Sequence, residues 1–149
     1  MANIAGEITI GRPVEVVFDF VADQRNEPQY NPDMVRAEKA TAGPIGKGTR
    51  FESAVRSAGR TAEMLIEVTG YERPRLLVST TTMKQFDIEY TLRFDPVGGG
   101  TRMRWSGQVR QKGAFRLLGP LVTWMGNRQE RRIWASLKSH LEGAACAGT

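Results

Sequence analysis

Cysteine and histidine are almost missing from this sequence of 149 residues, in which Cys146 and His140 are the only ones. A single cysteine forms no internal disulfide and shares no metal with a second thiolate, so a disulfide scaffold and a zinc finger are excluded. A single histidine excludes metal centres and acid–base schemes that need two imidazoles. We therefore expect no metal and no cofactor. His140, near a predicted helix end, is expected to be a surface or capping residue.

Long apolar runs are also missing. No stretch approaches the roughly 20 apolar residues that a helix needs to cross a bilayer, so we expect no transmembrane segment. The first residues, Met1 to Glu7, contain neither a basic leader nor an apolar stretch of the kind found in secretion signals. The expected location is therefore cytoplasmic.

Positive charge is present in modest excess, with a formal net charge of +5. Residues 1–33 carry 2 basic and 6 acidic side chains, whereas residues 83–149 carry 11 basic and 5 acidic ones. This excess suits an anionic partner such as a nucleic acid, a membrane surface or an acidic ligand, although scattered basic residues most often only face solvent.

Nucleic acid is the least favoured of these partners. Residues 128–138 contain four basic side chains, but Glu130 interrupts them. No strand face alternates aromatic and basic residues, as proteins that bind single-stranded nucleic acid require. The triplet Gly98-Gly99-Gly100 is followed by neither a Lys-Ser/Thr pair nor a helix start, so it predicts a hairpin turn rather than a phosphate loop. We therefore expect no nucleotide and no nucleic-acid partner.

The hydropathy pattern indicates a mixture of helices and strands. Alternating apolar residues predict a strand over about residues 3–11, and Pro13 followed by apolar residues at helical spacing predicts a short helix ending near Asp23. Residues 26–33, with two prolines and two asparagines, predict a loop or one irregular helical turn. Turn sequences then separate six further strands, predicted over residues 34–42, 48–57, 60–71, 75–83, 85–96 and 101–111.

Short connections predict antiparallel pairing of sequence neighbours, and therefore one seven-stranded curved sheet with a single apolar face. The alternation is clearest from Phe86 to Phe94, where apolar side chains take every second position. In this register, four acidic residues of the strands lie on the outward face of the sheet: Glu63, Glu67, Asp87 and Glu89.

One long helix, predicted over residues 115–142, is the candidate to cover the apolar face, which gives an α+β fold. Its apolar residues form two stripes, and at 100° per residue the second is rotated by about 100° from the first. We expect the helix to bend or wrap near Gly126-Asn127 so that both stripes face the sheet. The stripes are Leu118, Leu121, Val122 and Met125, and then Ile133, Trp134, Leu137 and Leu141.

Three stretches of sequence carry a resemblance to a known superfamily. They are Ile8 to Asp23 (ITIGRPVEVVFDFVAD), the turn Tyr30-Asn31-Pro32-Asp33, and Ile45 to Phe51 (IGKGTRF). With the order of elements, they resemble the SRPBCC or START-like superfamily, in its polyketide cyclase/dehydrase-like branch, where an aromatic residue precedes the Asn-Pro pair. The resemblance implies a helix-grip fold, in which two short helices follow the first strand and the sheet wraps around the long C-terminal helix. It covers nearly the whole chain and implies one domain over residues 1–149.

The resemblance also implies a cavity between the sheet and the long helix, lined by inward side chains near its open end. Each of these residues taken alone is more readily explained as ordinary core packing, since pockets and cores use the same residue types. Tyr90, Trp105 and Gln129 stand out because their polar atoms on apolar stripes need hydrogen-bond partners. The expected ligand contacts are Tyr30, Phe51, Ser53, Val55, Met64, Ile66, Thr80, Phe86, Ile88, Tyr90, Trp105, Leu118, Val122, Met125 and Gln129.

These motifs specify a fold better than an activity, because the superfamily hosts transfer proteins, sensors, cyclases and oxygenase domains. Its iron-dependent members need paired histidine ligands, which this sequence lacks. The favoured function is binding of a small hydrophobic or amphipathic molecule of lipid or polyketide type. One alternative is a metal-free cyclase or dehydratase, a lyase or isomerase acting on a carbonyl compound through water and Tyr90 or Tyr30. Another alternative is a protein-interaction module.

Tyrosine rather than an acid is expected to carry any catalysis, because the strand acids face outward and no other acid is expected to line the interior. The expected cavity has a volume of a few hundred Å³.

Residues 113–125 are unusually apolar for the approach to a helix. Phe115, Leu117 and Trp124 cannot all face the same core as Leu118 and Val122 on one helix. Large apolar groups rimmed by basic residues at positions 110, 112 and 116 predict a homodimer contact, a movable entrance to the cavity or an edge in transient contact with a membrane.

Overall fold

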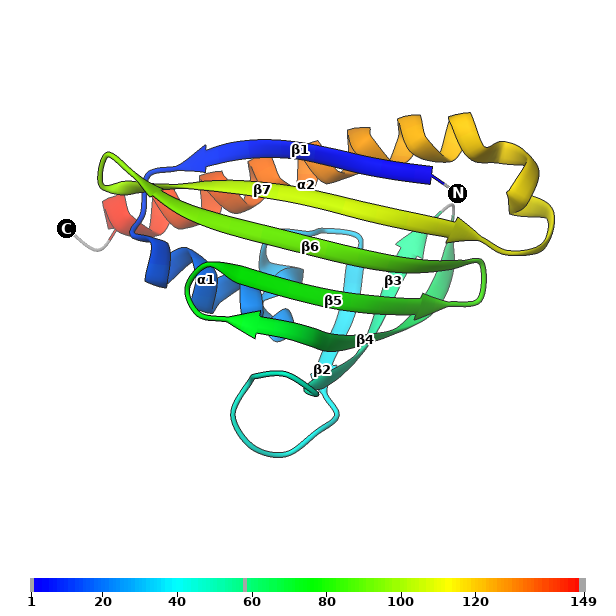
Figure 1. Cartoon of the computed structure of the whole chain (residues 1–149), viewed down its shortest axis with the longest axis horizontal. Coiled ribbons are helices and arrows are strands. Elements are labelled where there is room, and N and C mark those ends of the chain that lie inside the picture. The colour runs from blue at the N-terminus through cyan, green and yellow to red at the C-terminus, as the bar shows by residue number, and fades with distance from the viewer. Residues whose placement is uncertain (1, 58, 148–149) are drawn as a thin grey trace.

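A computed structural model describes residues 2–57 and 59–147 of the chain. Figure 1 shows a curved sheet that lies against one long helix, with shorter helical segments near both ends of the sheet. This is the α+β architecture expected from the sequence. In chain order the elements are β1 (Ala2–Ile10), α1 (Val14–Ala22), the 3-10 helix η1 (Gln24–Gln29), β2 (Met34–Lys39), β3 (Arg50–Ser57), β4 (Arg60–Glu72), β5 (Leu76–Met83), β6 (Phe86–Val97), β7 (Gly100–Gln111), the 3-10 helix η2 (Gly113–Leu118) and α2 (Gly119–Ala147).

The seven strands form one antiparallel sheet in the order β1-β7-β6-β5-β4-β3-β2. The first strand pairs with the last, so Ile8 lies opposite Met103 and Gly6 lies opposite Trp105. The indole of Trp105 lies across Gly6, where a β-carbon would fall 2.3 Å from a ring carbon. Glycine is therefore required at this position of β1.

Turn residues end the strands close to the predicted positions, although β2 stops at Lys39, earlier than predicted. Gly98 and Gly99 have positive φ angles of 53° and 84°, in the region that favours glycine, and they form the hairpin between β6 and β7. The prediction that the glycine triplet is a hairpin turn is confirmed.

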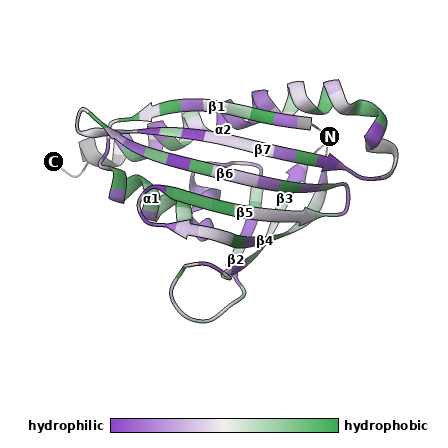
Figure 2. Cartoon of the chain, viewed as in Figure 1, coloured by the Kyte–Doolittle hydropathy of each residue, from purple (hydrophilic) through white to green (hydrophobic). Residues whose placement is uncertain are grey.

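The main core lies between the inner face of the sheet, α1 and the second half of α2. Val17 and Phe18 of α1 are fully buried, and the ring of Phe18 meets that of Phe94 edge-on, with 5.1 Å between centroids. Leu137 of α2 is also fully buried against the same group of side chains. Figure 2 shows that α1 is coloured largely as hydrophobic, as expected for a helix that packs against the sheet.

Helix α2 is unbroken at Gly126-Asn127, where the sequence predicted a bend. Gly126 lies against Ile4, whose side chain is 3.1 Å from the position of a β-carbon. Asn127 Oδ1 accepts a hydrogen bond from the backbone N–H of Ala5 at 3.1 Å. These two residues therefore hold the helix close to β1.

The second apolar stripe of α2 covers the sheet, whereas Val122 is the one residue of the first stripe that turns inward, so the expectation that both stripes face the sheet is wrong. The second stripe is buried, whereas Leu118, Leu121 and Met125 of the first are exposed and Val122 is half-buried. The reason is that an uninterrupted helix carries the first stripe about 100° away from the second. None of the helices in the described ranges combines the length and hydropathy needed to cross a membrane.

Candidate functional site

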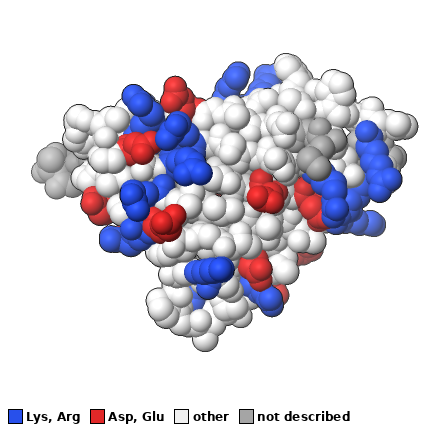
Figure 3. Space-filling model, in the orientation of Figure 1, with Lys and Arg blue, Asp and Glu red and all other residues white. Residues whose placement is uncertain are grey.

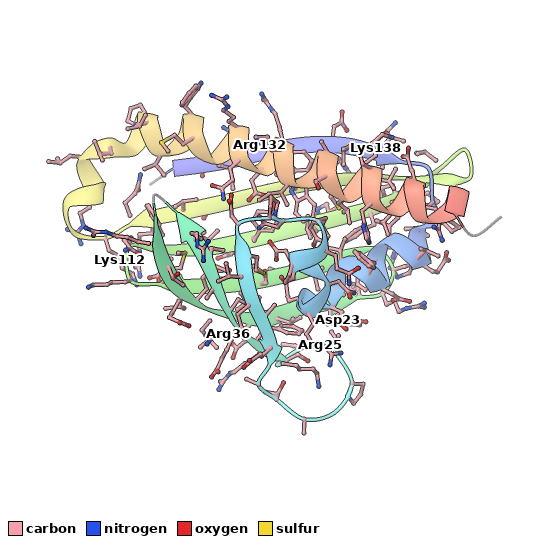
Figure 4. The ribbon with its side chains drawn as sticks, turned by 180° about the vertical axis from the view of Figure 1, so that it is seen from behind. Asp23, Arg25, Arg36, Lys112, Arg132 and Lys138 are labelled. Carbon is pink, nitrogen blue, oxygen red and sulfur yellow. The ribbon has the colours of Figure 1, made fainter. Side chains whose placement is uncertain are left out.

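Beyond the main core, the inner face of the sheet is only partly covered. Met64, Met83, Phe86 and Ile88 lie on the inner face by register, yet each keeps some solvent exposure. Val122 on α2 is also half-buried and, like Phe86 and Ile88, packs against a small second cluster formed by Ile4 and Val109. We call these five residues the open end. Figure 4 shows α2 crossing this side of the sheet, with η1 and β2 on the same side.

A hydrogen-bonded cluster joins β6 to α2 beside the open end. Tyr90 donates its hydroxyl proton to Glu130 Oε2 at 2.5 Å, and Trp134 Nε1 donates to the same hydroxyl oxygen at 3.0 Å. Glu130 and Trp134 are four positions apart on α2 and therefore share the helix face that turns toward the sheet. Together these contacts fix the Tyr90 hydroxyl between strand and helix.

A second carboxyl group, that of the half-buried Glu27 in η1, lies within electrostatic reach of Glu130. Asn31 Nδ2 donates a hydrogen bond to Glu27 Oε1 at 3.0 Å. Burial, together with the negative charge of Glu130, raises the pKa of Glu27 to about 7, against the opposing effect of the Asn31 hydrogen bond. The charge of Glu130 is thus close enough to Glu27 to favour its protonated form.

Burial governs the protonation of the other groups as well. It raises the pKa of Glu130, although the hydrogen bonds from Tyr90 and Trp134 act in the opposite direction. Burial and the neighbouring carboxylates raise the pKa values of Tyr90 and Tyr30 well above the usual range. Both tyrosines therefore keep their protons at neutral pH, while the carboxyl groups are shifted toward the range in which acid–base groups work best.

Trp134 is the centre of an aromatic wall around these polar groups. Its ring centroid lies 6.1 Å from that of Tyr30, 6.5 Å from that of Tyr90 and 6.2 Å from that of Trp105. Phe20 extends the wall, with its centroid 5.9 Å from that of Tyr30. The arrangement places the two phenols and the Glu130 carboxyl group beside flat apolar surfaces, where polar interactions are less weakened by water.

The expectation that no acid lines the interior is wrong. The strand acids do face outward: Asp87 pairs with Arg110 and Lys112, Glu63 with Arg36, and Glu67 with Arg50, while Glu89 is exposed. The inward carboxyl groups come from helical segments instead. Glu130 was detectable in the sequence, because it lies three, four and seven positions before Ile133, Trp134 and Leu137. Glu27 has no such signal, since it lies in a short segment rich in proline and asparagine.

The two catalytic candidates named from the sequence are both near Trp134. Tyr30 is buried, with a relative exposure of 4%. Tyr90 is half-buried and is the one whose hydroxyl contacts a carboxyl group. The structure thus brings both tyrosines to the cluster and adds the acids that the sequence reading left out.

The expected ligand contacts divide into three groups by position. Those buried in the interior are Tyr30, Phe51, Ser53, Ile66 and Trp105, and those that face inward with some exposure are Val55, Met64, Phe86, Ile88, Tyr90 and Val122.

The remaining four expected contacts do not face the interior. Thr80 pairs with Glu67 and Glu89 on the outward face, because its stretch of Ser and Thr carries no apolar alternation to fix the face. Leu118, Met125 and Gln129 are exposed, because the helix face that meets the sheet carries Glu130 rather than Gln129.

Some buried polar atoms have no hydrogen-bond partner among the described residues. They include Trp105 Nε1, Ser53 Oγ and Gln111 Nε2. A buried donor without a partner is costly, so such atoms mark positions where water or a ligand completes the hydrogen bonding. Of the three polar residues singled out in the sequence, Tyr90 is satisfied by Glu130, Gln129 reaches solvent and Trp105 Nε1 is left without a partner.

Two pockets open elsewhere on the surface. One of about 480 Å³ lies between α1 and the loop after β2, lined by residues that include Asp19, Lys39 and Tyr71. The other, of about 630 Å³, lies at the turn from β7 into η2 and is lined by Arg110, Gln111, Lys112 and Arg116. Within the described part of the chain, no three His, Cys, Asp or Glu side chains gather in a way that would hold a metal ion.

A family model described as "Polyketide cyclase / dehydrase and lipid transport" matches residues 1–142. The chain belongs to this family. The resemblance inferred from the three sequence stretches is thereby confirmed. No curated protein is similar enough in sequence to count as a relative.

Several solved structures are similar to this chain in fold. A START superfamily protein from Mycobacterium smegmatis has a TM-score of 0.83 at 16% identity, covering 97% of this chain and 99% of that one. The Zhui aromatase/cyclase from Streptomyces sp. R1128 has a TM-score of 0.80 at 12% identity, covering 94% and 93%. A protein from Thermus thermophilus has a TM-score of 0.81 at 20% identity, covering 95% and 98%. These similarities confirm the helix-grip fold.

Proposed function

We propose that the protein binds a small hydrophobic or amphipathic molecule between the open end and the Tyr90–Glu130–Trp134 cluster, within a single domain. The observation that carries the proposal is a hydrogen-bonded polar cluster on an otherwise apolar inner face that remains partly uncovered. Apolar surfaces with a few convergent polar groups and shifted pKa values are characteristic of ligand sites. The family to which the chain belongs, described by cyclisation, dehydration and lipid transport, supports the same function.

The chemistry of the ligand follows from the groups around the site. Met64, Ile88 and Val122 offer an apolar surface for a hydrocarbon or aromatic body. Glu130 offers carboxyl oxygens to a ligand hydroxyl, and Trp105 Nε1 offers a donor to a ligand carbonyl or ether oxygen. The favoured ligand is therefore amphipathic, with an apolar body and both a hydroxyl and an oxygen acceptor at one end.

Native mass spectrometry of the purified protein, followed by extraction of any bound compound, tests this proposal directly. We expect a co-purifying small molecule whose occupancy falls in Glu130→Gln. Glu89→Gln is the matched control, because Glu89 is adjacent to Tyr90 in sequence but faces outward. The proposal fails if no apolar or amphipathic compound binds, either on purification or when aromatic and fatty-acid probes are added.

A second candidate is acid–base catalysis on a carbonyl compound, which is favoured by the two carboxyl groups of raised pKa. The ionised carboxylate of Glu130 would accept a proton from the carbon next to a carbonyl, and a tyrosine hydroxyl would donate a hydrogen bond to the oxyanion that forms. Deuterium incorporation into a panel of β-diketones, followed by NMR in deuterium oxide, tests this step. We expect Glu130→Gln to abolish enzyme-dependent exchange and Glu89→Gln to leave it unchanged. Equal exchange in both variants would assign the site to binding alone.

A further inference from the structure

The first turns of α2 and the preceding η2 expose large apolar side chains. Leu117 is 88% exposed, Trp124 60% and Met125 55%, and Leu118 and Leu121 are also exposed. We call these five residues the apolar surface. The side chain of Phe115, which was expected to belong to the same group, lies outside the described part of the structure. Contiguous apolar groups of this size are unusual on a free protein surface and mark a contact with a partner.

The exposed face of α2 becomes basic where the apolar surface ends. Arg128, Arg131 and Arg132 are exposed in the next two turns, and the guanidinium of Arg128 lies 5.6 Å from the ring of Trp124. Glu130, the carboxylate within this stretch, turns inward to Tyr90. None of the three arginines forms an ion pair with a residue that the structure describes.

The other flank of the apolar surface is basic as well. Arg110 and Lys112 share the single carboxylate of Asp87, at 2.6 and 2.7 Å, which leaves an excess of positive charge. Arg116 is exposed and has no ion-pair partner among the described residues. Figure 3 shows the result as uncharged surface over the start of α2 between basic side chains on both sides, and Figure 4 places Lys112 at that end of the molecule and Arg132 farther along α2.

We propose that this face docks on an anionic lipid bilayer, with the apolar surface entering the interface and the flanking arginines and lysine contacting lipid headgroups. An apolar face that carries leucine and tryptophan, bordered by arginine and lysine, is the pattern of helices that lie in a membrane interface. A second copy of the chain fits less well. In a twofold dimer each patch meets itself, so basic flanks would face basic flanks.

Docking at this face has a consequence for the interior. Val122 lies on the inner side of the same turns that carry Leu121 and Trp124 on the outer side. The membrane would therefore lie next to the open end, which suits the exchange of an apolar molecule between bilayer and protein. The docking itself does not depend on the proposed ligand, and it is tested without one.

Co-sedimentation with phosphatidylcholine vesicles, with and without phosphatidylglycerol, tests the proposal on the ligand-free protein. We expect binding to the anionic vesicles that weakens at high salt, with a blue shift of tryptophan emission on binding. Leu117→Ser/Leu121→Ser should weaken binding by about tenfold or more, since it removes apolar area that enters the interface. Val35→Ser/Leu65→Ser is the matched control, because both residues are exposed apolar side chains on other elements.

Charge is tested separately. Neutralising Arg128, Arg131 and Arg132 to glutamine should weaken binding by about fivefold for each residue. The equally charged control is Arg56→Gln/Arg75→Gln/Arg93→Gln, which changes exposed arginines on β3, on β6 and in the turn before β5. The proposal is overturned if the protein does not bind anionic vesicles, or if the variants of the docking face bind as well as their matched controls. It is also overturned if light scattering shows a stable dimer that the Leu117→Ser/Leu121→Ser change dissociates.

Discussion

Tyr90 and Glu130 are 40 positions apart in the sequence and are joined by a hydrogen bond of 2.5 Å between the phenol of β6 and the carboxyl group of α2. The bond ties the long helix to the middle of the sheet at the boundary between the packed core and the open end. It also keeps a carboxyl group inside the molecule that would otherwise carry an uncompensated cost of burial.

Removing the phenol should destabilise the fold. Tyr90→Phe leaves the Glu130 carboxyl group without its donor and the Trp134 N–H without its acceptor, so we expect a loss of about 1–3 kcal/mol in the free energy of unfolding. Urea denaturation at neutral pH measures it. Tyr71→Phe provides the control, because Tyr71 is a half-buried tyrosine that packs through its ring against Phe18. Equal losses in both variants would show that the hydrogen bond contributes nothing.

The stability of the protein should fall as pH rises from about 4.5 to about 7. The pKa of Glu27 is raised from 4.5 to about 7 on folding, so the folded state holds a proton in this window that the unfolded state has released. We expect a loss of about 1–3 kcal/mol across the window, since each pKa unit corresponds to about 1.4 kcal/mol.

Urea midpoints at a series of pH values measure this dependence. Glu27→Gln should flatten it, and Glu15→Gln, at an exposed position of α1, should leave it unchanged. A wild-type stability that rises across the same pH window would contradict the shift of Glu27.

Adding one methyl group at Gly6 should be costly. The new β-carbon would fall 2.3 Å from the Trp105 ring, so either the indole or β1 must move. We expect Gly6→Ala to destabilise the protein by about 1–3 kcal/mol, the usual cost of overpacking. Gly11→Ala is the control, because its β-carbon would meet Glu142 at an ordinary contact distance of 3.6 Å. Calorimetry of the two variants should give a clearly lower melting temperature for Gly6→Ala alone.

The first turns of α2 should exchange their amide hydrogens faster than the rest of the helix. Residues 119–126 carry mostly exposed or half-buried side chains, whereas Ile133, Trp134 and Leu137 are buried. Local opening should therefore cost less in the first stretch. If the segment is a movable entrance, which is one of the alternatives that the sequence left open, bound ligand should slow exchange there. Uniform protection along α2, unchanged by ligand, would reject an entrance at this place.

The elements that the sequence predicted well are those with strong periodicity. The alternation from Phe86 to Phe94 determined the inner face of β6, and Pro13 and the glycine triplet marked an element start and a turn. Thr80 was placed on the wrong face because a run of hydroxyl residues has no apolar alternation. The bend or wrap near Gly126-Asn127 was inferred from the two stripes and from a glycine beside a poor helix former. In the structure, Gly126 lies close to Ile4 of β1.

In the candidate site, the sequence predicted the two tyrosines but not the two glutamates, for a different reason. Tyr90 was found because a polar atom on an apolar stripe needs a partner, and Tyr30 because it is the aromatic residue before the Asn31-Pro32 pair. Glu130 is in helical register with the buried stripe of α2, but it was passed over because it lies in a run of charged residues, which is typical of a solvent-exposed helix face. Glu27 is brought inside by η1, a short 3-10 helix without hydrophobic periodicity, so its burial depends on tertiary packing.

The pairing of β1 with β7 has a consequence for the order in which the chain can fold. Ile4 pairs with Gly107, so the partner of the first strand is synthesised about a hundred residues later. During synthesis, β1 stays unpaired until β7 has been made, whereas β3 to β6 are able to form hairpins with their sequence neighbours as they emerge. Long-range pairing of this kind slows folding, because the loop must close before the contact forms. The pairing of β1 with β7 therefore completes the sheet. Helix α2 can pack against the paired β1 only after that step.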